Sequence, residues 1–402
     1  MKWWFRQSLN IQILISIICG VLLGVLLGEH VGVIKPIGDI FLRLLKMLVV
    51  PLVFFTIADS VISMSDLRTV RLLGGSALLY FVSTSVLAVV AGLAITAMLR
   101  PGTQSISGLD TGTLEQAGEF NILDNIVQWF PANPVEAFAQ GNILQIIVFA
   151  VIVGIAVILM HKKSGNLRSI IKEGAELMMV ITNIIMKFAP YGICVLIADL
   201  VVSLDRSLIS DVGMFVIAFY TGIAFLFVVV YPLLIKVFAK RNPLQFYRDI
   251  SPALFVAAST TSSAATLPVS MKVAEENLGI PKKVWGFTLP FGLTFNMDGS
   301  AVVFSTIALF AAYLHNFDVS FAFVIQAVMI CFVLSVANAG IKGGGIVMST
   351  ILLQSLNLPL TLVPVLAAIW PVLDIGTTTG NITGDLVGTA IIGRKTDKTG
   401  SK

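Results

Sequence analysis

The chain has 402 residues, of which 57% are hydrophobic and 12% are charged, and its mean hydropathy is +0.95. Soluble proteins of this length carry about twice that charged fraction, so the composition excludes a soluble globular protein and predicts a helical protein that crosses a membrane several times. The net charge of +4 is then expected to come from basic loops on the cytoplasmic side, and no nucleic-acid partner is expected.

Apolar runs bounded by charged residues predict the first six membrane helices. They lie at about 8–28, 39–64, 73–99, 142–160, 170–202 and 208–238. The first run follows Lys2 and Arg6 as a signal peptide does, but it lacks a small-residue cleavage motif, so we expect a retained helix. Glycines recur on one side of this helix and predict close packing against another helix: Gly20, Gly24 and Gly28.

Basic residues concentrate in loops that alternate along the chain, and the positive-inside rule makes these loops cytoplasmic. Both termini are then expected in the cytoplasm. The residues that carry this prediction are Lys2, Arg6, Arg68, Arg71, Lys162, Lys163, Arg168, Lys240, Arg241, Arg394, Lys395 and Lys398. The polar segment between Pro101 and Pro134 is expected to be an external loop.

Two later segments have apolar runs that are too short to cross a membrane. The first has short arms on both sides of the hydroxyl-rich stretch 259–268, and the second has arms at 321–337 and 346–356 around the glycine-rich stretch 338–345. Half-length arms around a polar tip predict re-entrant hairpins, although a serine-rich cytoplasmic loop is an alternative for the first. Interrupted segments at matching places in two halves predict an inverted repeat with a binding site near the middle of the membrane.

Between these segments, the stretch 294–300 places an acid inside an apolar run. Asp298 at membrane depth needs a cation, a hydrogen-bonding partner or a water-filled cavity. Gly299 weakens the helix and frees backbone carbonyls, while the neighbouring Asn296 and Ser300 add oxygen atoms. Such a broken segment suits a small hard cation; the alternative is one buried acid that a neighbouring helix satisfies.

The last predicted span, at about 359–392, carries polar residues on one face. At about 100° per residue they fall within roughly 60° of arc. The residues on this face are Asp374, Thr378, Asn381 and Asp385, with Thr377 at its border. Two acids on one face without a basic partner nearby indicate a ligand-binding face. A separate row of glycines predicts close approach by another backbone: Gly376, Gly380, Gly384 and Gly388.

Four motifs occur together and in order: Thr261 to Pro268, Asn296 to Ser300, the glycine-rich stretch 338–345, and Asp374 to Asp385. In this combination the chain resembles, over nearly its whole length, the dicarboxylate/amino acid:cation symporters, the family of glutamate transporters and neutral amino acid transporters. The resemblance implies an all-α polytopic membrane protein with eight transmembrane helices, two re-entrant hairpins and inverted repeats. It also implies a homotrimer in the plasma (inner) membrane.

The resemblance further implies a static scaffold and a transport domain that moves as an elevator. The implied units are scaffold helices 1 and 2 (1–70), transport-domain helix 3 (71–100), an external loop with scaffold helices 4 and 5 (101–205), transport-domain helix 6 (206–250), hairpin 1 (251–280), broken helix 7 (281–316), hairpin 2 as the gate (317–358), helix 8 (359–393) and a cytoplasmic tail (394–402).

Three sodium-binding sets follow from the resemblance, all rich in oxygen ligands as a hard cation requires. One set is Gly292, Asn296, Asn381 and Asp385; a deeper one is Thr84, Ser85, Asn296 and Asp298; a third is Thr294, Met297, Ser335, Val336 and Asn338. The family often has Tyr where this chain has Phe81, which is harmless if the backbone carbonyl is the ligand. Sodium is expected as a transported ion and not as a bound cofactor.

The resemblance also implies a set of substrate-binding residues. Those that hold the substrate carboxylate and cap the pocket would be Thr261, Ser263, Ile341, Gly345 and Asn381. Asp374 would take the ammonium group with help from Thr378, because a buried carboxylate is the natural counter-ion of –NH3+. A substrate hydroxyl would meet Thr377 or Ser300.

Two departures from the family pattern bear on the substrate. Family members that carry acidic substrates have Arg at the position of Thr377, where its guanidinium pairs with the substrate side chain. An unpaired carboxylate in this pocket costs several kcal/mol, so we expect a small neutral amino acid such as alanine, serine or threonine. Lys342 stands where members often have Pro, and its positive charge could replace the missing Arg, so acidic amino acids or dicarboxylates are the alternative substrates. Cystine is a further alternative. Proton coupling also stays open.

The expected mechanism is secondary active symport, in which cations organise the broken helix, the substrate lets the second hairpin close, and the closed domain moves inward. An ion channel would need a continuous polar pore, which hairpins over a buried site argue against. An intramembrane hydrolase would need a base beside a serine, and Ser263 has no such His or Lys in its sequence neighbourhood. We therefore expect a transporter and not an enzyme.

Overall fold

The computed structural model describes residues 7, 9–63, 71–102, 127, 130–160, 165–203, 206–338 and 344–399. Every regular element in this part of the chain is helical. The elements before the hydroxyl-rich stretch are α1 (Leu9–Leu27), η2 (Gly28–Val33), α2 (Lys35–Ser63), α3 (Arg71–Leu99), α5 (Pro134–Gln140), α6 (Ile143–Leu159), α7 (Gly165–Ser203), α8 (Arg206–Phe225), η5 (Leu226–Val230), α9 (Tyr231–Leu234) and η6 (Ile235–Ala239).

The remaining elements form the half of the chain that carries most of the predicted ligands. They are α10 (Pro243–Thr260), α11 (Ser263–Glu276), α12 (Lys282–Phe295), α13 (Asp298–Leu314), α14 (Phe321–Ala337), α15 (Gly344–Ser355), η7 (Leu360–Leu362) and α16 (Val363–Thr399). Helix α16 therefore continues past the predicted boundary at 393.

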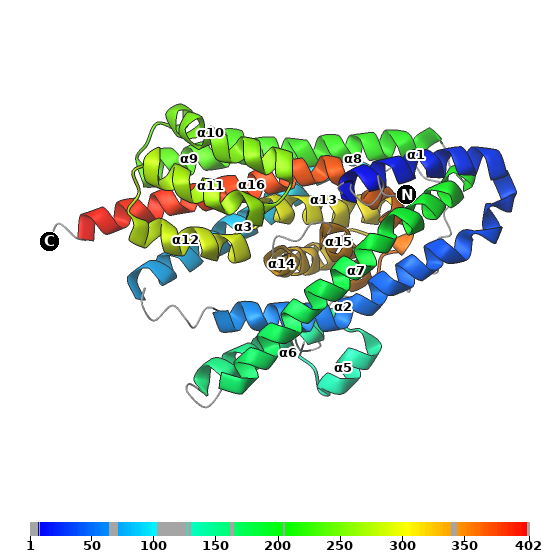
Figure 1. Cartoon of the computed structure of the whole chain (residues 1–402), viewed down its shortest axis with the longest axis horizontal. Helices are drawn as coiled ribbons and strands as arrows, with labels where there is room; N and C mark the ends of the chain where they lie inside the picture. Colours follow the sequence, from blue (N-terminus) through cyan, green and yellow to red (C-terminus); the bar gives the residue numbers. More distant parts are fainter. Residues whose placement is uncertain are drawn as a thin grey trace.

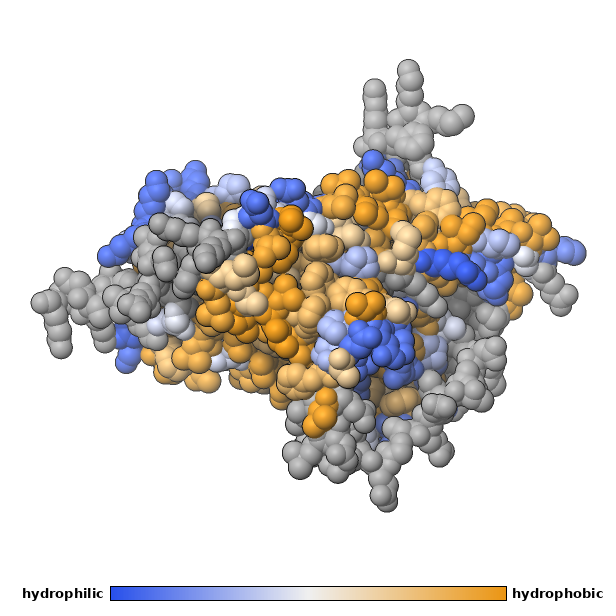
Figure 2. All heavy atoms as spheres, turned by 90° about the horizontal axis from the view of Figure 1, so that it is seen from below, coloured by the Kyte–Doolittle hydropathy of each residue, from blue (hydrophilic) through white to orange (hydrophobic). Residues whose placement is uncertain are grey.

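Six helical stretches of the described residues are long and apolar enough to cross a membrane. They are Lys35–Asp59, Gly75–Leu99, Gly165–Asp199, Ser210–Ala239, Lys282–Leu314 and Leu360–Arg394. The shorter apolar helices α1 and α6 coincide with two further predicted spans. Figure 2 shows hydrophobic side chains spread over much of one face of the protein, as lipid contact requires. The structure therefore contains apolar helices of the length that membrane crossing requires, and the total of eight stays a prediction.

The helices pack into two groups. In the first group α7 lies against both α1 and α2, and α6 lies against α2. In the second group α13 packs on α3 and α16, and α16 also contacts α10, α11 and α12. Helices α14 and α15 contact members of both groups. In Figure 1 α2 and α7 run diagonally below the long α8 and α16, and the upper end of α7 reaches the level of α1 and α8.

Close helix contacts explain part of the glycine pattern at the N-terminus. A side-chain carbon at Gly24 would come within 2.7 Å of the Ala198 carbonyl oxygen, and Gly20 faces the Cys194 carbonyl of the same helix α7 in the same way. Gly28 does not belong to this stripe, because it has φ +51 at the start of η2 and no atom lies near it. The left-handed turn there, and not helix packing, needs glycine.

The helical backbone is interrupted at each described place where the sequence predicts a break. Thr261, with φ 46, ends α10, and the Ser262 hydroxyl accepts a hydrogen bond from the Ala265 amide at 3.3 Å to begin α11. Asn296 and Met297 separate α12 from α13. Asn338 ends α14, and the rest of the second tip, 339–343, lies outside the described residues. Insertion of the α10–α11 and α14–α15 pairs as re-entrant hairpins stays a prediction.

Candidate functional site

The break between α12 and α13 is tied to α3 by two hydroxyl groups. Thr84 Oγ1 donates to Asn296 Oδ1 at 3.0 Å, and Ser85 Oγ donates to Asp298 Oδ1 at 3.1 Å. All four residues are buried. The spacing of Thr84 and Ser85 in one helical turn lets α3 present two adjacent oxygens to the broken segment. The structure therefore brings the deeper predicted cation set together.

Helix α16 completes this polar cluster from the opposite side. Asn296 Nδ2 donates to Asp385 Oδ1 at 3.1 Å, so Asn296 bridges α3 and α16. No Lys or Arg of the described residues forms an ion pair with Asp298 or Asp385. Two buried carboxylates with only neutral partners carry a large desolvation cost, which a bound cation offsets. The carboxylate, amide and hydroxyl oxygens here fit a small hard cation.

Two tyrosines, which the sequence analysis did not predict, also belong to the polar cluster. The Tyr231 hydroxyl lies 3.0 Å from Asp298 Oδ2 and 3.0 Å from the Gly380 carbonyl oxygen, and the Tyr80 hydroxyl donates to the Gly384 carbonyl at 3.2 Å. Both tyrosine rings are buried. A tyrosine in an apolar run is usually placed at the membrane interface, so the sequence alone offers no signal that either hydroxyl points inward.

Asn381 links the polar cluster to a neighbouring pocket. Its Oδ1 accepts hydrogen bonds from the backbone amides of Gly299 at 2.8 Å and Ser300 at 3.2 Å. The first turn of α13 has no side-chain cap of its own, so Asn381 supplies that cap from α16. The Asn338 amide donates to Ser300 Oγ at 3.0 Å.

A small pocket with a cavity volume of about 20 Å³ lies beside this cap. It forms where the α10–α11 break, the α12–α13 break, α14, α15 and α16 converge. The residues that line it are Thr261, Ser263, Met297, Asn338, Gly345, Asp374, Thr377, Thr378 and Asn381. Seven of the nine predicted substrate-binding residues are in this lining. Ser300 is not in the lining but accepts a hydrogen bond from the lining residue Asn338, and Ile341 lies outside the described residues.

The third predicted cation set is only partly assembled around this pocket. Met297 and Asn338 line the pocket, and Asn338 Oδ1 is buried without a hydrogen-bond partner among the described residues. The Ser335 hydroxyl donates to the Phe332 carbonyl at 2.7 Å. Thr294 and Val336 are half-buried. A buried amide oxygen without a donor is available as a ligand for a cation.

Tight packing fixes the backbone on which both sites stand. A carbon added at Gly380 would come within 3.0 Å of Gly299 Cα, so α16 and α13 touch backbone to backbone. At the other glycines of the predicted row, side chains of other helices pack against the glycine: Phe219 and Tyr220 at Gly376, Asn296 and Asp298 at Gly384, and Tyr80 at Gly388. The row therefore serves one backbone contact and three side-chain contacts.

The known proteins to which this chain is similar in sequence are membrane transporters. The family model described as "Sodium:dicarboxylate symporter family" matches residues 9–395. A C4-dicarboxylate transport protein of Geobacter sp. (strain M21) is 32% identical over 352 residues, which cover 85% of this chain and 80% of that protein. A proton/sodium-glutamate symport protein of Geobacillus stearothermophilus is 31% identical over 369 residues, or 90% of this chain and 87% of the relative.

A third relative has a different named substrate. The neutral amino acid transporter B(0) of Oryctolagus cuniculus is 30% identical over 398 residues, which cover 90% of this chain and 73% of that protein. The family match spans both helix groups, the broken α12–α13 segment and the polar face of α16. The chain therefore belongs to the sodium:dicarboxylate symporter family and is a cation-coupled membrane transporter, not an enzyme.

Proposed function

We propose that the protein carries a small neutral L-amino acid, such as alanine, serine or threonine, into the cell together with sodium. One observation supports this substrate class above all. The described lining of the pocket contains one carboxylate, Asp374, and no lysine or arginine. An amino acid brings one ammonium group that Asp374 can pair with, whereas a second substrate carboxylate would find no described basic partner.

The lining suggests how such a substrate would lie. Asp374 would bind the ammonium group with Thr378 beside it, one turn further along α16. Ser263, at the first turn of α11, would receive the carboxylate together with the amides of the α10–α11 break. Thr377 would contact a short side chain, because its own hydroxyl already donates to the Leu373 carbonyl at 2.9 Å and leaves lone pairs for a substrate hydroxyl.

Coupling between substrate and sodium would run through Asn381. This residue lines the pocket and also caps the first turn of α13, in which Asp298 lies. A substrate that orders Asn381 would thereby order the segment that bears the cation ligands. A bound cation would order the same segment and, through it, Asn381. Such reciprocal ordering raises the affinity of each ligand when the other is present.

The movement we propose is an elevator in a homotrimer. The group of α1, α2, α6 and α7 would be the static scaffold, and the group around α13 and α16 would move with the bound ligands. Helices α14 and α15, which contact both groups, would form the gate. Both termini would lie on the cytoplasmic side of the plasma membrane. Sodium would be the coupling ion, with protons as the alternative.

The relatives favour a second candidate, which is cation-coupled uptake of acidic amino acids or dicarboxylates. Two of them are named for C4-dicarboxylate and glutamate transport. In that case a basic group outside the described residues, with Lys342 the first suspect, would pair with the additional carboxylate. Cystine is a further alternative among amino acids.

Uptake into proteoliposomes tests the proposal. Labelled serine is offered with and without an inward sodium gradient, in competition with unlabelled alanine, aspartate or cystine. We expect sodium-driven serine uptake that alanine blocks and aspartate does not. Sodium-driven aspartate uptake, with aspartate blocking serine, would replace the neutral assignment by the acidic one. Uptake that depends on a proton gradient but not on sodium would contradict the choice of coupling ion.

A further inference from the structure

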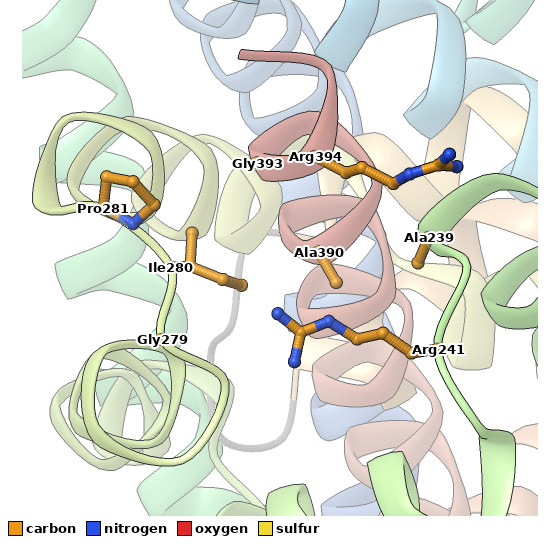
Figure 3. Close-up of a pocket in the computed structure, with 8 residues that line it drawn as sticks. All are labelled: Ala239, Arg241, Gly279, Ile280, Pro281, Ala390, Gly393 and Arg394. Atoms are coloured by element: carbon orange, nitrogen blue, oxygen red, sulfur yellow. The ribbon is translucent and has the colours of Figure 1, made fainter. Parts of the chain in front are cut away.

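A second pocket lies at the end of the molecule where α16 ends, away from the substrate pocket. It is bounded by the end of η6, the loop between α11 and α12, and the last turns of α16 (Figure 3). The lining residues are Ala239, Arg241, Gly279, Ile280, Pro281, Ala390, Gly393 and Arg394. The cavity measures about 100 Å³, several times the ~10–15 Å³ that a single water needs. It therefore has room for a small polyatomic group.

Two arginines give this pocket a positive charge. Arg241 donates to the Leu278 carbonyl at 2.6 Å, and Arg394 donates to the Phe238 carbonyl at 2.7 Å, so both guanidinium groups are held in place. In Figure 3 the Arg241 side chain reaches towards the loop at Gly279, and the Arg394 side chain runs in the opposite direction towards Ala239, so the two guanidinium groups lie on opposite sides of the pocket. A guanidinium has five N–H donors, and each arginine uses one on these carbonyls. The lining contains no Asp or Glu, and no ion pair of the described residues includes either arginine.

The start of helix α12, which adjoins the pocket, adds to its positive electrostatic potential. Helix α12 begins directly after Pro281, and no side chain caps its first turn. Its uncapped amide groups and the positive end of its dipole favour an anion nearby. Lys282 and Lys283 are exposed in this turn. The pocket thus combines a cavity, two oriented guanidinium groups and a helix start, and all three favour the same charge.

Apolar side chains on the outer surface point to the kind of anion. The main chain of Phe238 accepts the hydrogen bond from Arg394, while 53% of Phe238 is exposed. Val237 on η6 and Leu244 at the start of α10 are also exposed, on the two sides of Arg241 in the chain. A charged pocket whose lining residues Ala239 and Arg241 neighbour exposed apolar residues in the chain matches a lipid, whose phosphate is polar and whose tails are not.

We propose that Arg241 and Arg394 form a binding site for the phosphate of an anionic phospholipid headgroup. The guanidinium groups would hold the phosphate oxygens, and the acyl chains would run along the apolar surface beside Phe238. The site lies on the end of η6 and the connection that follows it, the α11–α12 loop and α16, so a bound lipid would tie these three segments together. Free phosphate offers the same oxygens without the apolar tails, and the experiment separates the two sources.

Lipid-dependent thermal stability of the purified full-length protein in detergent tests the assignment. Phosphatidylglycerol, phosphatidylcholine and inorganic phosphate are each titrated into the wild type and into R241Q, R394Q and the double variant. We expect phosphatidylglycerol to raise Tm at lower concentration than phosphatidylcholine. Each arginine removed should weaken its apparent affinity about fivefold, and the double variant about 25-fold. R248Q, an exposed arginine of α10 outside the pocket, is the matched control and should bind as the wild type does.

The outcomes discriminate clearly. Equal stabilisation of the wild type and the double variant by phosphatidylglycerol would overturn the site. Full stabilisation by inorganic phosphate, with no added effect of phosphatidylglycerol, would overturn the lipid as its occupant, as would an equal effect of phosphatidylcholine. If the double Gln variant elutes as aggregate, the pair R241K and R394K takes its place. The two lysine variants keep the positive charge but lose the bidentate geometry of the guanidinium group, so they should bind phosphatidylglycerol a few-fold more weakly than the wild type does.

Discussion

Single residues decide what the cation cluster can hold. Asp298 and Asp385 are both buried, and among the described residues their hydrogen bonds come from hydroxyl and amide groups with no positive charge. A carboxylate in such surroundings differs from its neutral amide isostere mainly in charge. Substitutions that keep shape and remove charge therefore report on the bound ion and not on packing.

Replacing Asp385 by Asn tests the proposed sodium ligand. The side chain keeps its size beside Asn296 but loses its negative charge, so we expect the apparent sodium affinity to fall at least tenfold, about 1.4 kcal/mol. Because the sites are coupled, the substrate affinity should fall as well. Sodium-dependent uptake and substrate binding are measured on the same sample. Unchanged values for both ligands would remove Asp385 from the site.

Replacing Thr377 by Arg tests the basis of the neutral substrate class. A guanidinium in the pocket would pair with a side-chain carboxylate through charge-assisted hydrogen bonds of about 1.5–3 kcal/mol. We expect aspartate to compete roughly ten- to hundredfold better than in the wild type, and serine uptake to be lost. Thr377→Ser, which keeps the hydroxyl, is the control. Wild-type selectivity in the arginine variant would contradict the role of this position.

His315 provides a pH-dependent contribution to stability. It lies just after α13 with Nε2 at 3.2 Å from Thr361 Oγ1, and Nδ1 is buried without a partner among the described residues. Burial lowers the pKa of His315 below its usual value of about 6.5. The unfolded chain therefore binds this proton first, and folding stability falls as the pH drops below about 6.5 towards the lower folded-state pKa.

The variant H315Q should lose this part of the pH dependence. We expect the wild type to lose more Tm than H315Q between pH 7.5 and pH 5.5, because glutamine keeps a hydrogen-bonding group for Thr361 but does not titrate. Thermal unfolding in detergent at several pH values measures the difference. Parallel curves for the two proteins would show that His315 titrates alike in both states.

At the scale of helices, the site depends on how closely α13 and α16 approach. Gly299 and Gly380 allow backbone contact between them, and this contact brings Asn381 to the start of α13. Gly299 faces the Thr377 carbonyl at a separation that leaves no room for a side-chain carbon. The same approach therefore positions the cation ligands of one helix and the pocket lining of the other.

Gly299→Ala should separate these helices. The added methyl meets main-chain atoms, which cannot rotate away, so we expect a loss of about 1–3 kcal/mol of stability and weaker binding of both sodium and substrate. Gly286→Ala on α12 is the matched control, since nothing lies near that position and alanine is the better helix former by up to about 1 kcal/mol. Equal Tm values for the two variants would contradict the close contact.

At the scale of the whole molecule, the two helix groups touch directly where α16 contacts α1 and α7, and they also meet through α14 and α15. Ligands that bind within the second group are expected to stabilise the folded protein by mass action, by about 2.7 kcal/mol at 100 times Kd. We expect sodium, compared with potassium at equal ionic strength, to raise Tm, and serine to raise it further only when sodium is present. A serine effect that is the same in potassium would contradict coupling between the sites.

Much of this protein could be predicted from local sequence. Hydropathy located the membrane helices, because lipid demands continuous apolar runs whatever their packing. The hydroxyl, glycine and acid motifs located the helix breaks at Thr261 and Asn296, because these residues have strong local conformational preferences. Helical periodicity grouped Asp374, Thr378 and Asn381, which indeed line one pocket.

Other features were decided only by tertiary structure. Tyr231 reaches Asp298 across 67 positions of the chain, and Arg241 and Arg394 line one pocket across a still longer separation. The side chain of Asn381 proved to be the cap of a helix 81 positions away, at Ser300. No local pattern encodes such pairs, because they arise from the way the helices pack. The sequence by itself determined that the chain spans a membrane and where its helices break, since both follow from solvation and short-range backbone preference. Packing decided which polar groups share a site, since that depends on which helix faces meet.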